Sequence, residues 1–279
     1  MRSLPSIPDL AEAPDGFFDS GHFWIQEHVD GVHLGFEMEE SGLLRFGLSG
    51  TPIDPGDPPP HLESAVETVQ DQFERDRLRD AVETVDRYTF VGAVPLGGRM
   101  EYRWTKMPAF LGTDIWDVEG DEFLSPDATH RIFEELGLEP IHVYEKEVPA
   151  RRLHPDGYRI PESAYASEPA AGVRFRKKGG GSVKLTRPLE GGSGFSETDE
   201  LEGRIEASVT ATFLEETCRR SNRDPSTVSV SELAPMVARR LAREGYWRFE
   251  GVLREQPDRF REVVEAVVTS RWREEPDRR

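Results

Sequence analysis

The chain has 279 residues, enough for two folding units, and its 53 acidic and 35 basic residues give a net charge of −18. A single cysteine excludes an internal disulfide and a thiolate cluster. No apolar run reaches the roughly 20 residues of a membrane span, and the opening residues lack the apolar stretch of a signal peptide. We therefore expect a cytoplasmic protein with no membrane partner. Only five of the basic residues are lysines, and this acidic, lysine-poor composition suggests a halophilic source. At about 1 M salt the repulsion between the acidic protein and RNA is screened, so the net charge does not exclude RNA as a partner.

The first half of the chain is predicted to be rich in antiparallel strands. Apolar and polar residues alternate over 23–38 on both sides of Asp30-Gly31, which predicts a hairpin, and "LLRFGL" predicts a third strand. Helical spacing over 61–88 predicts a kinked helix or two helices in series. The stretches "YTFVGAVPL" and "FLGTDIWDV" are β-branched and aromatic and predict two more strands. A short helix is predicted between Ser125 and Gly137.

The second half changes character after residue 190. The stretch "AAGVRFRKKGGGSVKLTRP" predicts two strands around a glycine loop, and "EGGSGFSETDE" predicts a flexible linker. Beyond it, Ser229 and Glu232 form a capping box for a helix that Gly245 ends. We therefore predict an α+β domain with antiparallel sheets at 1–190, a linker at 191–200 and a small all-helical C-terminal domain at 201–279.

Three stretches of the first domain resemble the motifs of one family. "QEHVDG", "FLGTDIWDVEGDEFLSP" and "AAGVRFRKKGGGSVKL" resemble motifs I, IIIa and IV to V of the covalent nucleotidyltransferases, and among them the ATP-dependent RNA ligases. The resemblance covers roughly residues 22–190 and implies a nucleotidyltransferase (ATP-dependent ligase-like) fold, ATP and Mg²⁺ as cofactors, and nucleotide and RNA ends as partners. In that family a motif I lysine attacks the α-phosphate of ATP, and here His28 stands in its place. The chain therefore resembles a divergent, haloarchaeal-type RNA ligase.

The resemblance nominates the site residues. The candidate catalytic residues are His28 and Lys184, and Lys184 would contact the α-phosphate. The candidate nucleotide-binding residues are Glu27, Asp30, Gly31, Phe110 and Gly172. Phe110 either stacks on adenine, as the resemblance implies, or is a core residue. Glu27 and Asp30 either contact the nucleotide or serve only to complete the hairpin. For Lys184 the alternative is a lysine whose stem runs along the strand toward solvent.

His28 has three readings that the sequence leaves open. A neutral imidazole is a competent nucleophile toward phosphorus, and with an ordinary pKa of about 6.5 it is mostly neutral at pH 7. It is shorter than a lysine side chain, however, and misplacement by about 1 Å can cost roughly 100-fold in rate. His28 is therefore a turn residue, a nucleotide contact without covalent chemistry, or a slow nucleophile.

Four polar positions of the family are altered. Leu48 and Thr186 stand where an arginine and a second lysine are expected. Ala93 and Ala171 stand where the resemblance implies glutamates that bind ribose and a metal ion. This pattern predicts an RNA ligase-like protein that binds ATP and RNA, with impaired adenylyl transfer and RNA end joining. The alternative is a catalytically inactive nucleotide- or RNA-binding protein that keeps the ligase fold.

The remaining candidates are weaker. The "KKGGGS" loop lacks the ending of a phosphate-binding loop and is predicted to be a hairpin tip. His22, His28 and His33 do not share a simple strand spacing, so no metal ligands are nominated. The tail arginines suit an RNA backbone, but the interleaved glutamates favour a salt-bridged helix face. The sequence leaves the oligomeric state open.

Overall fold

A computed structural model describes residues 6–190 and 200–273. The chain divides into two compact units, one of Met1–Pro58, Ala65–Pro95 and Met100–Leu189, and one of Pro59–Ser64, Leu96–Arg99 and Glu190–Arg279. All but the last residue of the predicted linker at 191–200 lies outside the described residues, so the domain boundaries at 190 and 201 stay a prediction. Within those two stretches no helix has the length and apolar character needed to cross a membrane.

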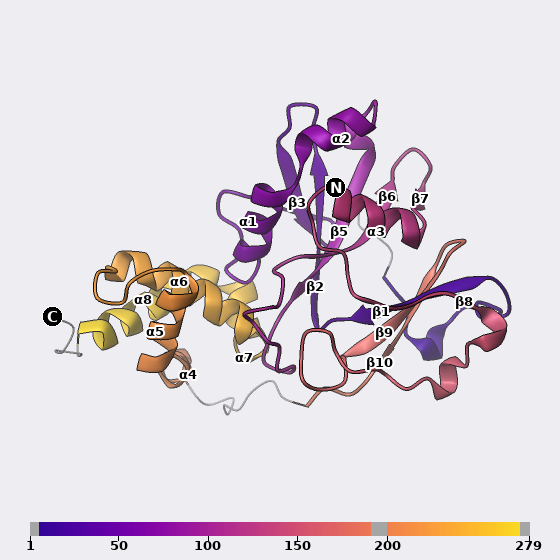
Figure 1. Ribbon diagram of the computed structural model, residues 1–279. Coiled ribbons are helices and arrows are strands. Elements are labelled where there is room, and N and C mark those ends of the chain that lie inside the picture. The colour runs from indigo at the N-terminus through magenta and orange to yellow at the C-terminus, as the bar shows by residue number, and fades with distance from the viewer. Residues whose placement is uncertain (1–5, 191–199, 274–279) are drawn as a thin grey trace. The chain divides into compact units, whose positions relative to one another are not determined.

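The first unit contains two sheets whose described strands pair in antiparallel fashion (Figure 1). The four-stranded sheet has the order β10-β9-β1-β8, built from β1 (His22–His28), β8 (Val143–Pro149), β9 (Gly172–Lys177) and β10 (Ser182–Thr186). The six-stranded sheet has the order β4-β3-β2-β5-β6-β7, built from β2 (Gly31–Met38), β3 (Leu44–Leu48), β4 (Thr51–Ile53), β5 (Tyr88–Pro95), β6 (Leu111–Asp117) and β7 (Glu122–Phe123). The predicted α+β class with antiparallel sheets is confirmed.

The predicted hairpin at Asp30-Gly31 is wrong, because β1 and β2 belong to different sheets. β1 pairs with β8 and β9, whereas β2 pairs with β3 and β5. The backbone N–H of Asp30 donates to the Tyr102 hydroxyl at 2.7 Å, so the chain crosses between sheets at this point instead of turning back. Gly31 is required by close packing, since a Cβ there would lie 2.0 Å from the Val94 carbonyl oxygen. The turn-like dipeptide therefore marks a crossover.

Helices cover the outer face of the six-stranded sheet. α1 (Glu63–Gln72) and α2 (Arg75–Ala81) are the predicted pair of helices in series, and α3 (Pro126–Glu135) is the predicted short helix. The rings of Phe36, Phe90, Phe110 and Phe133 are fully buried on this face. A Cβ at Gly92 would lie 2.2 Å from the Phe110 ring, so the glycine makes room for it. Apolar side chains fill this face, which leaves the opposite face of the sheet to form a site.

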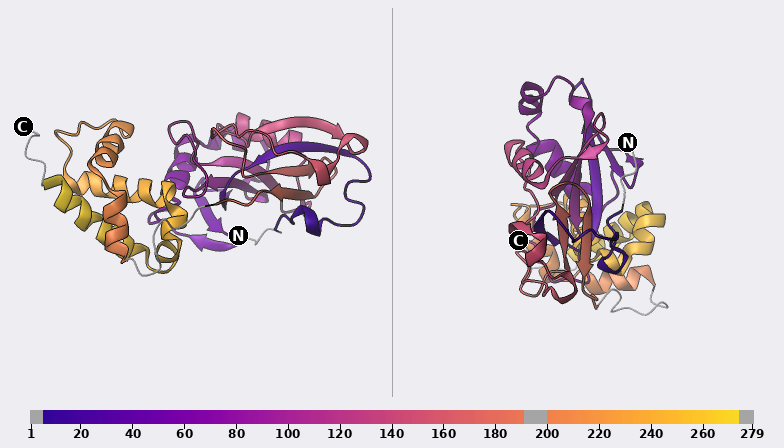
Figure 2. Two further views of the ribbon diagram at one scale, coloured as in Figure 1. Left: turned by 90° about the horizontal axis from the view of Figure 1, so that it is seen from below. Right: turned by 90° about the vertical axis from the view of Figure 1, so that its right-hand side faces the viewer.

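The second unit is helical beyond residue 200, as predicted (Figure 2). Its helices are α4 (Leu201–Ser208), α5 (Ala211–Arg220), α6 (Val230–Glu244), α7 (Tyr246–Glu255) and α8 (Pro257–Arg273). The capping box of Ser229 and Glu232 opens α6, and Gly245 follows its last residue. Short 3-10 turns lie in the first unit at η1 (Leu10–Glu12), η2 (Val85–Arg87), η3 (Ala150–Arg152) and η4 (Pro155–Gly157).

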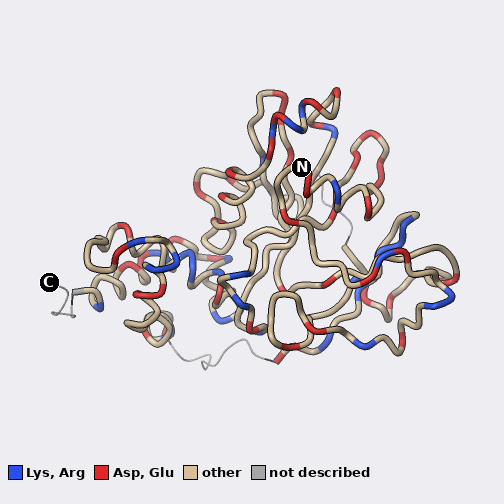
Figure 3. The backbone as a smooth tube through the Cα atoms, in the orientation of Figure 1, with Lys and Arg blue, Asp and Glu red and all other residues tan. Residues whose placement is uncertain are grey.

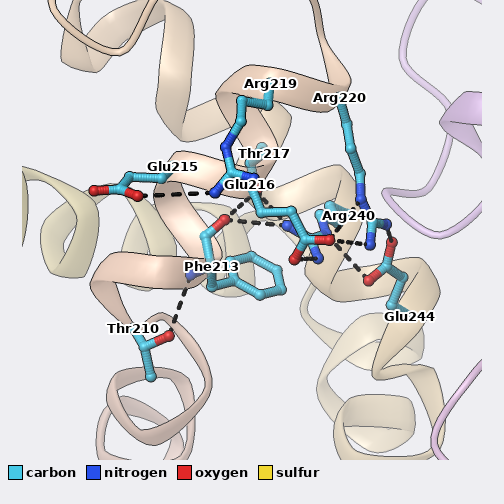
Figure 4. A network of polar contacts seen from close by, with 9 residues as sticks. All are labelled: Thr210, Phe213, Glu215, Glu216, Thr217, Arg219, Arg220, Arg240 and Glu244. Atoms are coloured by element: carbon cyan, nitrogen blue, oxygen red, sulfur yellow. Dashed lines mark hydrogen bonds and ion pairs between the residues drawn. The ribbon is translucent and has the colours of Figure 1, made fainter. Parts of the chain in front are cut away.

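Several of the tail arginines are paired with glutamates. Basic and acidic residues are interspersed in this part of the chain (Figure 3). Glu216 accepts from Arg220 at 2.5 Å and from Arg240 at 2.8 Å, and Glu244 accepts from the same two arginines (Figure 4). This arrangement matches the predicted salt-bridged helix face, because much of the positive charge that could attract RNA is neutralised locally.

Candidate functional site

The inner faces of the two sheets enclose a cavity of about 850 Å³. Its described lining includes His28 of β1, His33 of β2, Asp114 of β6, Arg174 of β9 and Lys184 of β10. Alternation along the strands places these side chains on the inner faces, whereas their immediate neighbours in sequence point away. His28 and Lys184, both nominated by the motif resemblance, line the same cavity.

Two histidines in the cavity are held in the neutral form. The pKa of His28 is lowered to about 3, mainly because the ring is enclosed by protein and further because His33, Lys184 and Arg174 lie near it. The pKa of His33 is also lowered, chiefly by the same enclosure, and Asp114 opposes the shift. The His33 side chain nevertheless keeps accessible surface, which it presents to the cavity. At neutral pH both rings can accept a hydrogen bond or attack an electrophile.

A buried ion pair joins the two sheets at the back of the cavity. Arg174 donates to the two oxygens of Asp114 at 2.6 and 2.9 Å and to Ser182 Oγ at 2.7 Å. Arg176 approaches the same carboxylate at 3.3 Å and donates to the backbone oxygen of Thr113. Burial alone would raise the pKa of Asp114, but the two guanidinium groups outweigh it and hold that pKa well below its ordinary value. Two cations thus share one anion, and the cluster keeps a surplus positive charge.

Further cations and a glycine loop surround the cavity mouth. Lys177 and Lys184 both line it, as do Gly179, Gly180 and Gly181 between β9 and β10. Gly180 and Gly181 have positive φ, which fits the predicted hairpin tip. The N-terminal segment lies beside this hairpin, and Lys184 Nζ is 3.9 Å from Asp9 Oδ1. The lysine side chain is partly exposed and belongs to the lining of the cavity.

The other nominated residues lie outside the lining of this cavity. The Glu27 carboxylate accepts from Ser163 Oγ at 2.6 Å and from the Ala164 N–H at 3.0 Å. The backbone of Asp30 is bonded to Tyr102, as described above, and Phe110 lies in the apolar core. Gly31 and Gly172 are packing glycines. A Cβ at Gly172 would lie 2.3 Å from the Leu185 carbonyl oxygen, so this glycine lets β9 approach β10 opposite His28. These five residues support the frame of the site.

The residues present do not fit a divalent metal ion held by the protein. Magnesium is bound in proteins mainly through carboxylate oxygens. Among the described residues no cluster of three or more His, Cys, Asp or Glu side chains is placed to hold a metal. Asp114 is the carboxylate of the described cavity lining, and its oxygens already accept from Arg174. A cation at Asp114 would also meet two guanidinium groups.

Sequence reasoning missed His33, Asp114, Arg174 and Arg176 as site residues. The signal for the arginines was present in "GVRFRK", where Arg174 and Arg176 alternate with apolar residues and must share one face of the strand. Asp114 stands in the middle of a largely apolar strand, which is unusual for an ionised side chain. Pairing these charges required knowing that β6 and β9 face one another, and that is a tertiary relationship.

Comparison with solved structures finds RNA ligases. An apo structure of a point mutant of the Naegleria gruberi RNA ligase matches with a TM-score of 0.50 and 13% identity, covering 66% of this chain and 55% of that chain. The chain has the RNA ligase fold. A structure of the same ligase with ATP and Mn has a TM-score of 0.49 at 13% identity, covering 66% of this chain and 56% of that one. An archaeal ATP-dependent RNA ligase has a TM-score of 0.46 at 14% identity, covering 90% and 65%.

The match with a TM-score of 0.50 shows the fold, and the activity is a matter for a proposal. The chain spans between 55% and 65% of the length of these three ligase chains. Scans against protein-family models and against curated proteins find no match. The nucleotidyltransferase fold expected from the motifs is thereby confirmed, with antiparallel sheets followed by a helical C-terminal part.

Proposed function

We propose that this chain is a divergent RNA ligase-like nucleotidyltransferase that binds ATP in the cavity between its two sheets. One observation carries the proposal: in a chain of net charge −18, the described lining of this cavity holds Arg174, Lys177 and Lys184 against the single carboxylate of Asp114. A cationic cavity in an acidic protein favours an anionic ligand. Its volume of about 850 Å³ is in the range of small-molecule sites.

The phosphates would lie toward β9 and β10. Lys184 reaches the cavity from β10, where the motif resemblance implies a contact with the α-phosphate. The guanidinium of Arg174 is anchored by Asp114 and Ser182, so it is fixed before a ligand arrives. Its Nε–H is buried and has no partner among the described residues. Preorganised cations of this kind stabilise the negative charge of a phosphoryl group without rearrangement.

His28 is the group that would replace the family's lysine. Burial keeps the pKa of His28 at about 3, so its imidazole is neutral and nucleophilic at neutral pH. Attack of a ring nitrogen on the α-phosphorus would form a nitrogen–phosphorus bond and break the bond to the bridging oxygen. Pyrophosphate would leave, and the ring proton would pass to solvent. We propose that the AMP is then offered to an RNA end, at a rate limited by the short reach of the imidazole.

A second function is favoured by the packing of two alanines. Ala93 and Ala171, at positions where the resemblance implies carboxylates, are buried in one apolar cluster with Val29, Met100 and Leu111. Replacement of polar contacts by apolar packing fits a protein that holds a nucleotide or an RNA end without transferring AMP. The second candidate is therefore a catalytically inactive binding protein with the ligase fold, in the same cytoplasmic, salt-rich setting.

Adenylation with labelled nucleotide separates the two candidates. Pure protein in high salt is incubated with α-labelled ATP, with Mg²⁺ or with a chelator, and run on a denaturing gel after acid and alkaline washes. Transfer to His28 gives a label that acid removes and alkali preserves, and His28→Ala loses it. His22→Ala, at the exposed start of the same strand, is the matched control and keeps the label.

Two other outcomes have defined meanings. If the wild type takes no label under conditions where His28→Lys does, adenylyl transfer by the natural protein is contradicted. If neither protein is labelled but ATP raises the melting temperature, the binding function is supported. Absence of both label and thermal shift contradicts the nucleotide site itself.

A further inference from the structure

We propose that this site binds the phosphates of its nucleotide without a divalent metal ion, the cationic side chains of Arg174 and Lys184 supplying the charge that a metal ion would supply. This inference rests on the proposed function, because it concerns how the same ligand is held. The motif resemblance implies Mg²⁺ as a cofactor, and in this property the chain departs from the family that it resembles.

The first support is that the cavity's carboxylate is already in use. Asp114 accepts from Arg174 at 2.6 and 2.9 Å, and Arg176 lies 3.3 Å away on its other side. The side chains of this cluster are nearly inaccessible, at 6% for Asp114 and 8% for Arg174. A metal ion could bind Asp114 only after these pairs were broken, which would leave two buried guanidinium groups without their anion. Breaking a buried pair in this way is strongly unfavourable.

The second support is the apolar packing at the two altered positions. Ala93 and Ala171 are 6% and 3% exposed and share their cluster with Met100, Tyr102 and Leu111. A hydrated cation placed there would lose water without gaining oxygen ligands, and burying an uncompensated charge is costly. Neither position can take over the role of a metal-binding carboxylate.

The third support is that cationic side chains line the cavity where phosphates would enter. Arg174 is held in place by its bonds to Asp114 and Ser182. Because Arg176 lies beside the same carboxylate, the cluster keeps a positive charge that can attract a phosphate. Lys184 reaches the same cavity from the neighbouring strand, at the position paired with Arg174 in the β9–β10 ladder. These two side chains are therefore adjacent on one face and can contact one phosphate chain together.

The consequence is a reversed metal dependence. A Mg²⁺ ion bound to ATP cancels part of its negative charge, so in a site without ligands for the metal it weakens the attraction to Arg174 and Lys184. In a site whose carboxylates hold the metal, the same ion strengthens binding. The sign of the metal effect on ATP affinity distinguishes the two arrangements.

Calorimetric titration with ATP tests this inference. The dissociation constant is measured in a chelator and in excess MgCl₂, at one fixed high ionic strength set by KCl. We expect the dissociation constant in the chelator to be no more than about threefold higher than in Mg²⁺, and lower where the metal weakens the attraction to the cationic side chains. Binding that is more than about threefold tighter with Mg²⁺ overturns the inference and leaves the proposed function standing. Absence of ATP binding in both conditions overturns the proposed function and this inference with it.

A lysine variant provides an independent readout. In Lys184→Ala the phosphates lose the cation of Lys184, so the charge of Mg²⁺ becomes favourable. The dissociation constant in the chelator, divided by that in Mg²⁺, should rise by about three- to tenfold relative to the wild type. Lys178→Ala is the matched control, because Lys178 is on the same hairpin but pairs with Glu147 at 3.0 Å and does not line the cavity. It keeps the wild-type ratio. An unchanged ratio in Lys184→Ala contradicts a role for this lysine in place of a metal ion.

Discussion

The ammonium group of Lys184 lies 3.9 Å from the carboxylate of Asp9, and the two residues also form a parallel β-bridge. The backbone N–H of Lys184 donates to the carbonyl oxygen of Pro8 at 3.0 Å. The N-terminal segment therefore runs along the free edge of β10, and Ile7 and Pro8 line the cavity. A phosphate that reaches Lys184 must compete with Asp9 for the same charge.

Replacing Asp9 should strengthen nucleotide binding. In Asp9→Asn the ion pair is removed while the backbone bridge can persist, so the full charge of Lys184 becomes available to a phosphate. Because the pair is partly exposed, we expect ATP affinity to rise by about two- to fivefold in a titration at constant salt. Asp15→Asn, an exposed residue of the same segment, is the control and leaves affinity unchanged. Unaltered or weaker binding in Asp9→Asn would show that Asp9 does not compete with the ligand.

Replacing Asp114 should destabilise the first unit. Asp114→Asn leaves Arg174 and Arg176 buried without their shared anion, and we expect a loss of about 3–5 kcal/mol in the free energy of unfolding. Denaturant unfolding followed by tryptophan fluorescence measures the change. Glu119→Gln breaks an ion pair with Arg87 in which the glutamate is 63% exposed, so it should cost at most about 1 kcal/mol. Equal effects from the two variants would contradict the structural role of Asp114.

The neutral state of His28 predicts an acid-sensitive fold. In the folded chain the pKa of His28 is about 3, whereas in the unfolded chain it is near its ordinary value of 6.5. Between these values the unfolded chain binds a proton that the folded chain does not, so stability is full above about pH 6.5 and falls as the pH drops toward about 3. The lowered pKa of His33 acts in the same direction.

Substitution of His28 should remove its share of that slope. In His28→Asn the loss of unfolding free energy between pH 6 and pH 4 should be smaller by up to about 1.4 kcal/mol per pH unit. Denaturant unfolding at a series of pH values gives the slope directly. His22→Asn, at the exposed start of β1, should keep the wild-type slope. An identical slope in His28→Asn would mean that the imidazole is not desolvated as the fold implies.

Local signals in the sequence predicted most elements but not how the strands meet. The helix starts and stops around Ser125, Ser229 and Gly245 were readable because capping is a property of adjacent residues. Asp30-Gly31 was misread as a hairpin because the partner strands of β1 lie far along the chain, at β8 and β9. Strand β8 was not predicted, since its central residues are exposed and charged and lack the apolar alternation of a strand.

The candidate site was predictable only in part for the same reason. His28 and Lys184 could be nominated from motifs, and the structure places both on one cavity. Phe110 could not be assigned to a cavity or a core from its sequence context, because that depends on which face of the six-stranded sheet is covered by helices. The pairing of Arg174 with Asp114 joins strands separated by 60 positions, and no local pattern encodes it.

Arg240 connects two helices of the second unit. Its guanidinium donates to the Phe213 carbonyl oxygen at 3.1 Å and to Thr217 Oγ1 at 2.9 Å, pairs with Glu216 and Glu244, and lies over the Phe213 ring (Figure 4). Its side chain is 11% exposed, so these contacts are shielded from salt and tie α5 to α6.

Arg240→Met keeps much of the apolar stem and removes these bonds. We expect it to lower the free energy of unfolding by about 2 kcal/mol or more and to increase amide exchange in α5 and α6. Arg219→Met is the matched control, because Arg219 is 64% exposed and has one 3.8 Å contact with Glu215; its loss should cost less than about 0.5 kcal/mol. If the two variants exchange and unfold alike, the structural role of Arg240 is contradicted.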